Sequence, residues 1–245
     1  MSLRPNSEVP AKIPTTVITG FLGAGKTSLI RHLLARAGGR RLALIINEFG
    51  DLGIDGEILK GCGAEACSED DLVELANGCI CCTVADEFLP TLDALLARPE
   101  PPHHIIIETS GLALPKPLVQ AFNWPEIRTK ITVDGVISVI DALAVAEDRF
   151  TANVGAVAAQ RLADNGLDHD SPLEELYEDQ LACADLVVIN KTDLLAENDL
   201  ARVARAVAKG VRPLVRSVRA SHGKVDPAVL LGLGAATETD IDSRP

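Results

Sequence analysis

The sequence has 245 residues, of which 47% are hydrophobic and only 3% aromatic, and its formal net charge is −12. This negative charge would repel a nucleic-acid backbone, and so few aromatic side chains leave no stacking platform for bases, so we expect no nucleic-acid partner. No apolar run approaches the roughly 20 residues that span a bilayer, and residues 1–14 lack the apolar segment of a secretory signal, so we expect a cytoplasmic protein with no membrane partner.

Aliphatic runs alternate with segments of helical spacing along most of the chain. Thr15–Thr19 is a short β-branched run that ends at Gly20, and apolar residues at helical spacing follow from Lys26 to Ala37. Five later aliphatic runs predict strands: Leu42–Ile46, Ile105–Ile107, Val136–Ile140, Leu186–Ile189 and Leu214–Val218. Further helices are expected over Val84–Leu96, near Glu174–Cys183 and over Leu200–Ala208. Such alternation indicates a three-layer α/β fold, a mostly parallel sheet flanked by helices.

These elements predict one domain over residues 13–230. Residues 1–12 are expected to be an N-terminal extension, and about 50–83 a cysteine-containing insertion. Residues 231–245 are polar and glycine-rich at their start, so we expect a disordered tail there.

The turn after the first strand carries a phosphate-binding motif. Residues 20–27 (GFLGAGKT) match G-x-x-x-x-G-K-[ST] between a strand and a helix, so backbone N–H groups and the helix N-terminus can bind phosphate. Lys26 is expected to reach the β- and γ-phosphates, and Thr27 to offer its hydroxyl to Mg²⁺. The expected contacts to the nucleotide phosphates are Gly20, Gly23, Ala24, Gly25, Lys26, Thr27 and Ser28. The alternative is a glycine-rich turn without a ligand.

A second motif, Asn190-Lys191-Thr192-Asp193, follows the fifth expected strand. The Asp193 carboxylate can accept hydrogen bonds from both the N1–H and the 2-amino group of guanine, a donor pair that adenine lacks. We therefore expect Asn190, Lys191 and Asp193 to bind the guanine of GTP, although the motif alone would also suit a surface turn. Arg219 and Ala220, after the last expected strand, are either a further contact to the base or part of a solvated loop.

Acidic residues stand just past two of the buried strands. Glu108 is expected to hold Mg²⁺, directly or through water, or to orient the attacking water, unless it only caps the strand end. The N–H of Gly111 is expected to sense the γ-phosphate, and Glu48 and Asp51 are candidates to bind Mg²⁺ or water. Lys26, Glu48, Asp51 and Glu108 are therefore the expected catalytic residues.

Five of the six cysteines lie within residues 62–82. A disulfide framework would spread them along a small secreted chain, so the clustering favours metal binding, with buried cysteines or a redox pair as alternatives. Thiolates at this spacing suit Zn²⁺ or Co²⁺ in tetrahedral geometry. The expected ligands are Cys79, Cys81 and Cys82. Cys62 and Cys67 are either auxiliary ligands or not involved, and Cys183 is expected in the core.

Five sequence segments occur in the order seen in the CobW-type metallochaperone GTPases, which this chain resembles over about residues 13–230. They are Gly20–Thr27, Glu48–Asp51, residues 78–83 (GCICCT), 108–111 (ETSG) and 190–193 (NKTD). That family is of the same broad class as the urease and hydrogenase maturation GTPases. The resemblance implies a G domain of the SIMIBI type that uses GTP and Mg²⁺. The family usually carries a C-terminal domain and often a histidine-rich stretch, neither of which this sequence contains.

The function that the resemblance implies is a GTP-hydrolysing metallochaperone. It would bind Co(II) or Zn(II) at the Cys-x-Cys-Cys site in a nucleotide-dependent way and deliver the metal. A member of the CobW branch would supply cobalt for cobalamin biosynthesis, with a cobalt chelatase as recipient and a nucleotide-dependent dimer as a further expectation. Two other readings stay open: a regulatory GTPase with a structural zinc, and a metal-buffering protein with negligible turnover.

Overall fold

The computed structural model describes residues 12–46, 72–74, 88–151, 155, 157 and 173–244. Within these residues the core is a seven-stranded sheet in the order β3-β2-β4-β1-β5-β6-β7, and every pair of neighbouring strands in it is parallel. The strands are β1 (Ile13–Thr19), β2 (Leu42–Ile46), β3 (Leu72–Glu74), β4 (His104–Glu108), β5 (Ile131–Asp141), β6 (Leu186–Asn190) and β7 (Arg216–Arg219). The expected parallel α/β architecture is confirmed.

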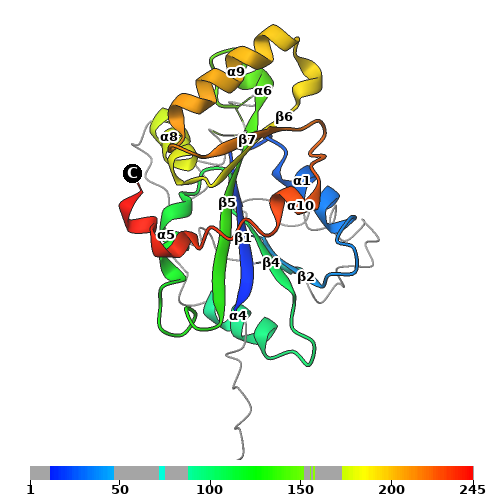
Figure 1. Ribbon diagram of the computed structural model, residues 1–245, viewed down its shortest axis with the longest axis vertical. Coiled ribbons are helices and arrows are strands. Elements are labelled where there is room, and N and C mark those ends of the chain that lie inside the picture. The colour runs from blue at the N-terminus through cyan, green and yellow to red at the C-terminus, as the bar shows by residue number, and fades with distance from the viewer. Residues whose placement is uncertain are drawn as a thin grey trace, which may run out of the picture.

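Helices cover both faces of the sheet (Figure 1). On one face, α1 (Lys26–Leu34) and α10 (Pro227–Leu230) share a core cluster with the strands. On the other face lie α4 (Leu89–Leu96), α5 (Pro115–Ala121), α6 (Ala142–Ala146), α8 (Leu173–Cys183) and α9 (Glu197–Gly210). None of the helices in the described segments is long and apolar enough to cross a membrane.

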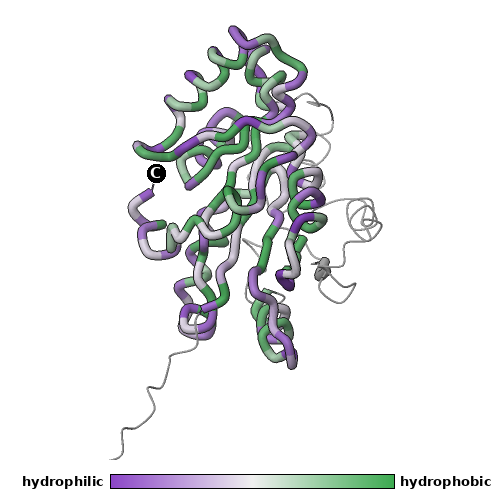
Figure 2. Tube along the Cα trace, turned by 45° about the vertical axis from the view of Figure 1, so that its right-hand side comes forward, coloured by the Kyte–Doolittle hydropathy of each residue, from purple (hydrophilic) through white to green (hydrophobic). Residues whose placement is uncertain are grey.

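Burial on both faces explains why the sequences of β2, β4 and β6 are almost continuously aliphatic rather than alternating. In β6, Val188 packs in the cluster that contains α1, while Val187 packs with α8 and α9. The helix α9, which has one apolar side, instead alternates hydrophobic and hydrophilic residues along its length (Figure 2). The residues of α9 that this spacing buries are Leu200, Val203 and Val207.

Some elements differ from the sequence prediction. The strand β3 was not expected, because its three residues show no pattern of their own and become a strand only by pairing with β2. The last strand begins at Arg216, not at Leu214, whose side chain is 97% exposed and whose φ of 74° belongs to a turn. The first part of the helix expected from Val84 lies outside the described residues; the described helix α4 begins at Leu89.

The expectation of a disordered C-terminal tail is wrong for residues 231–244, which fold back onto the domain. They form two short 3₁₀ helices, η4 (Thr237–Thr239) and η5 (Ile241–Ser243). The carboxylate of Asp134 in β5 accepts hydrogen bonds from three consecutive backbone N–H groups, those of residues 232–234, at 2.7–3.0 Å. Backbone N–H groups of this tail are therefore partners of a buried carboxylate, which composition alone cannot show.

Asp185, just before β6, is the centre of the tail's attachment. One carboxylate oxygen accepts hydrogen bonds from the guanidinium groups of Arg212 and Arg244, and the other from the backbone N–H of Val136 and the hydroxyl of Thr237. The side chain of Arg244 is only 2% exposed, so ion pairs such as the one with Asp185 must offset the cost of burying its charge.

Replacing Asp185 with alanine is expected to lower the free energy of unfolding by about 3 kcal/mol, because it leaves a buried guanidinium without its main counter-charge. Chemical denaturation measures this change, and limited proteolysis reports whether the C-terminal segment detaches. Asp199→Ala is the matched control, since it breaks an exposed ion pair with Arg202 and should cost less than about 0.5 kcal/mol. Equal free energies of unfolding for the two variants would contradict the role of Asp185 as the main counter-charge of a buried guanidinium.

Candidate nucleotide-binding site

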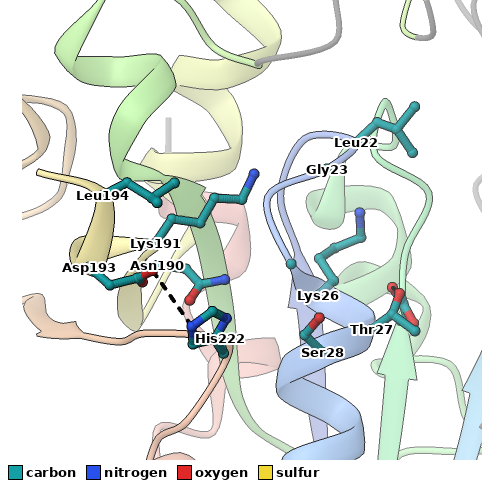
Figure 3. A pocket seen from close by; sticks show the side chains of 12 residues that line it. Leu22, Gly23, Lys26, Thr27, Ser28, Asn190, Lys191, Asp193, Leu194 and His222 are labelled. Carbon is teal, nitrogen blue, oxygen red and sulfur yellow. Dashed lines mark hydrogen bonds and ion pairs between the residues drawn. The ribbon is translucent and has the colours of Figure 1, made fainter.

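A cavity of about 610 Å³ opens where β1, β4 and β6 end, the edge of a parallel sheet at which ligands commonly bind. Figure 3 shows Lys26 and Thr27 on one side of it and Lys191, Asp193 and His222 on the other. The residues that line it are Leu22, Gly23, Gly25, Lys26, Thr27, Ser28, Glu108, Asn190, Lys191, Asp193, Leu194 and His222. The two motifs, separated by more than half of the chain, therefore form one site.

The phosphate end of the cavity is the turn between β1 and α1. Gly25 has a φ of 102°, and a Cβ there would lie 2.3 Å from the amide nitrogen of Asn190, so both the backbone angle and the space require glycine. The helix α1 begins at the next residue and has no acidic side chain in its first turn, which leaves its N-terminus open to an anion. The side chain of Lys26 is 7% exposed, and its ammonium group donates to the carbonyl oxygen of Gly20 at 2.9 Å.

Two oxygen-bearing side chains meet beside this turn. The hydroxyl of Thr27 donates to a carboxylate oxygen of Glu108, at 3.2 Å, and both residues line the cavity. A hydroxyl and a carboxylate are hard oxygen ligands of the kind that Mg²⁺ prefers. The pair therefore fits the expected role in holding Mg²⁺.

Asn190 joins the opposite end of the cavity to the phosphate-binding turn. Its amide nitrogen donates to the carbonyl oxygen of Ala24 at 2.9 Å, and its amide oxygen accepts from the backbone N–H of Gly223 at 3.0 Å. Asn190 therefore links the phosphate-binding turn to the loop that follows β7.

Lys191 and Asp193 stand on the wall opposite the phosphate-binding turn. The ammonium group of Lys191 pairs with the buried carboxylate of Asp141 at 2.6 Å. The carboxylate of Asp193 is 33% exposed, and the imidazole of His222 lies beside it, with Nε2 and Oδ2 3.6 Å apart. An acceptor with this much exposure remains available to a ligand.

The loop after β7 contributes a residue that the sequence analysis did not select. His222 lines the cavity, whereas Arg219 pairs with Glu197 at 2.7 Å, and Ala220 is buried with its carbonyl oxygen bonded to Thr192. Neither Arg219 nor Ala220 is among the lining residues. The only sequence signal for His222 is the glycine that follows it in this loop.

Other expected site residues are not among the residues that line the cavity, or lie outside the described residues. Gly20 and Ala24 act through the carbonyl groups named above, and Gly111 lies against the backbone of Leu22. The expected residues that the structure does not describe are Glu48, Asp51, Cys62, Cys67, Cys79, Cys81 and Cys82.

Within the described segments, no group of three or more metal-binding side chains occurs. Cys183 is buried in the core, as expected, and burial raises the pKa of its thiol to about 11, so it stays protonated and inert. Burial likewise lowers the pKa of His104 to about 4, and its ring bonds the hydroxyl of Thr16 at 2.8 Å. Neither side chain belongs to the nucleotide cavity.

A parallel sheet whose first strand leads through a glycine-rich turn into a helix, with the turn facing an Asn-Lys-x-Asp segment, defines a P-loop nucleotide-binding protein. Residues 14–219 match the family described as "CobW/HypB/UreG, nucleotide-binding domain", and the chain belongs to that family.

Two curated relatives, both named zinc chaperone CobW, share most of this sequence. One, from Sinorhizobium sp., is 60% identical over 95% of this chain and 66% of its own length. The other, from Pseudomonas aeruginosa, is 57% identical over 96% of this chain and 64% of its own length. The chain therefore spans about two thirds of the length of these relatives. A Zn(II)-bound triple mutant of the YjiA GTPase, a protein of Escherichia coli, is 25% identical with a TM-score of 0.57, covering 91% of this chain and 62% of its own.

Proposed function

We propose that this protein is a GTPase that carries zinc and couples the binding and release of the metal to its nucleotide state. The observation that carries the nucleotide half of the proposal is the single cavity in which Lys26 and Thr27 face Asp193. The metal half is supported by the relatives, which are named zinc chaperones, and by the cluster of cysteines in the sequence. The cytosol is the proposed location, because thiolates that bind a metal need a reducing compartment to stay unoxidised.

In this proposal each end of the cavity binds one part of GTP. Asp193 accepts the two guanine donors, Asn190 keeps the base end aligned with the phosphate end, and Lys26 neutralises the β- and γ-phosphates. Thr27 and Glu108 would hold Mg²⁺, which when bound neutralises charge on the phosphate oxygens.

Hydrolysis requires a positioned water. Because Glu108 is fixed at the end of β4, it is the candidate in the described structure to orient this water. We assign Glu48 and Asp51, which follow β2 in the chain, a supporting role toward Mg²⁺ or water, and Gly111 the contact to the γ-phosphate.

The proposed cargo site is the thiolate group of Cys79, Cys81 and Cys82. Such ligands bind Zn²⁺ more tightly than Co²⁺, and the relatives are named for zinc, so zinc replaces cobalt as the first choice. Two variants of this proposal remain. In one, the protein delivers cobalt to a chelatase; in the other, it forms a nucleotide-dependent dimer that presents the metal.

A competitive metal titration tests the coupling. The chain is loaded with Mg²⁺ and a non-hydrolysable GTP analogue, with Mg²⁺ and GDP, or with no nucleotide, and Zn²⁺ or Co²⁺ is titrated against a chromophoric chelator. We expect the dissociation constant for Zn²⁺ to be at least about tenfold lower in the GTP state, and by linkage zinc should tighten the GTP analogue over GDP by the same factor.

The control for this titration is the chain with Cys79, Cys81 and Cys82 replaced by serine, which should lose the nucleotide-dependent part of zinc binding. Equal zinc affinity in all three nucleotide states would refute the coupling. Zinc that leaves only on unfolding would favour the regulatory GTPase with a structural metal, and strong zinc binding without GTP turnover would favour the metal buffer.

A further inference from the structure

Gln180, on α8, is a buried polar side chain that the proposed chemistry does not use. It is 1% exposed, and its amide nitrogen donates to two carbonyl oxygens, that of Gly111 at 3.2 Å and that of Ala113 at 3.1 Å. Both carbonyls belong to the segment that follows β4, residues 109–113, which we call the post-β4 segment. One amide group therefore holds two points of this segment from the α8 side.

The opposite side of the post-β4 segment lies against the phosphate-binding turn. A Cβ on Gly111 would come within 2.6 Å of the backbone nitrogen of Leu22, so the two backbones touch at this point. The segment also starts from a fixed position, because the N–H of Thr109 donates to the carbonyl oxygen of Ile18 in β1. Any movement of the segment away from α8 or toward it would change its contact with the turn.

The contact between α8 and the phosphate-binding turn is also direct. The ring of Tyr177, one helical turn before Gln180, lies 6.2 Å from that of Phe21 and 5.0 Å from that of Phe150. Burial of this ring raises the pKa of Tyr177 to about 12. At its other end, α8 leads within three residues into β6, which carries Asn190. The helix thus connects the guanine end of the cavity to the post-β4 segment.

We propose that Gln180 is a positioning residue for the third phosphate: it fixes the post-β4 segment against the phosphate-binding turn, so that Glu108 and Gly111 are held where the γ-phosphate and the attacking water must lie. This inference rests on the proposed GTPase function and names the side chain that keeps its catalytic end in place. Preorganised groups accelerate a reaction because they need not be ordered during it.

The proposal predicts that a change of Gln180 slows GTP hydrolysis but leaves GDP binding largely intact. The side-chain hydrogen bonds of Gln180 go to the post-β4 segment, and not to Ser28 or Asp193, which are proposed to bind GDP and should stay in place when Gln180 is changed. Gln180→Leu, which keeps the size and removes both donors, is expected to lower kcat for GTP hydrolysis about tenfold, while KM and the dissociation constant for GDP change less than threefold. Asp179→Asn, at the exposed neighbouring position, is the matched control and should keep the parent kcat.

Gln180→Met guards against a folding defect in the first variant. It keeps the length of the side chain and adds no buried charge but has no donor for the two carbonyls, so the same loss of kcat is expected. Thermal unfolding of each variant shows whether the change is only one of stability. A kcat within threefold of the parent in a folded variant, or a parallel loss of GTP and GDP affinity without a change in kcat, would overturn the proposal.

The failure of this inference and that of the proposed function can be told apart. A parent chain that binds GTP without hydrolysing it contradicts the GTPase assignment. The role of Gln180 is then decided by the ratio of the dissociation constants for GDP and a non-hydrolysable GTP analogue. A ratio that Gln180→Leu shifts about tenfold against the triphosphate supports the positioning role, and an unchanged ratio rejects it.

Discussion

Replacing Lys26 with alanine is expected to lower kcat/KM for GTP hydrolysis by between about 10² and 10³. Lys26 is 7% exposed and lines the cavity, and its ammonium group donates to the carbonyl oxygen of Gly20, which places the charge beside the turn that is expected to bind phosphate. The other lysine of the cavity, Lys191, is paired with Asp141 and cannot take over this charge without breaking that contact.

Phosphate release measured over a range of GTP concentrations gives this ratio. Lys209→Ala, on the exposed side of α9, removes one positive charge that does not line the cavity and is expected to leave kcat/KM unchanged. The Lys26 variant should also lose the difference in zinc affinity between the GTP and GDP states, since it no longer binds the third phosphate well. A Lys26→Ala chain that hydrolyses GTP at the parent rate would remove the phosphate-binding turn from the mechanism.

The phosphate end of the site could be predicted from sequence because its requirements are local. Gly25 must adopt a φ of 102° and leave space for Asn190, and Lys26 must follow at the start of a helix, so residue type and spacing are both constrained. The central strands were predictable for a related reason. Burial on two faces demands an unbroken aliphatic run, which few other structures require.

The features that were not predicted depend on partners far away in the sequence. The tail is ordered because Asp134 and Asp185, about 50 to 100 residues earlier, accept its hydrogen bonds. The choice between Arg219 and His222 depends on how the loop turns after β7. Gly223 sits so close to α1 that a Cβ would lie 2.5 Å from the backbone nitrogen of Leu29, and this approach places His222 rather than Arg219 at the cavity.

Replacing Asp193 with asparagine is expected to weaken GDP binding about 100-fold and to strengthen binding of xanthosine diphosphate by a similar factor. The carboxylate can accept from both the N1–H and the 2-amino group of guanine, and hydrogen bonds to a charged group contribute about 1.5–3 kcal/mol. An asparagine amide offers one donor and one acceptor, which match the 2-oxo group and N1–H of xanthine but oppose the 2-amino group of guanine.

Because Asp193 lies opposite the phosphate-binding turn, the defect should be confined to the base. Inorganic phosphate release from xanthosine triphosphate by the variant should then approach the parent's rate with GTP, since Lys26, Thr27 and Glu108 are unchanged. Glu197→Gln, which removes a carboxylate near the same loop but outside the cavity, should leave the preference for guanine intact. If the Asp193 variant lost both nucleotides equally, the carboxylate would be a structural support of the loop. Guanine selection would then have to come from another part of the cavity, where His222 lies beside Asp193.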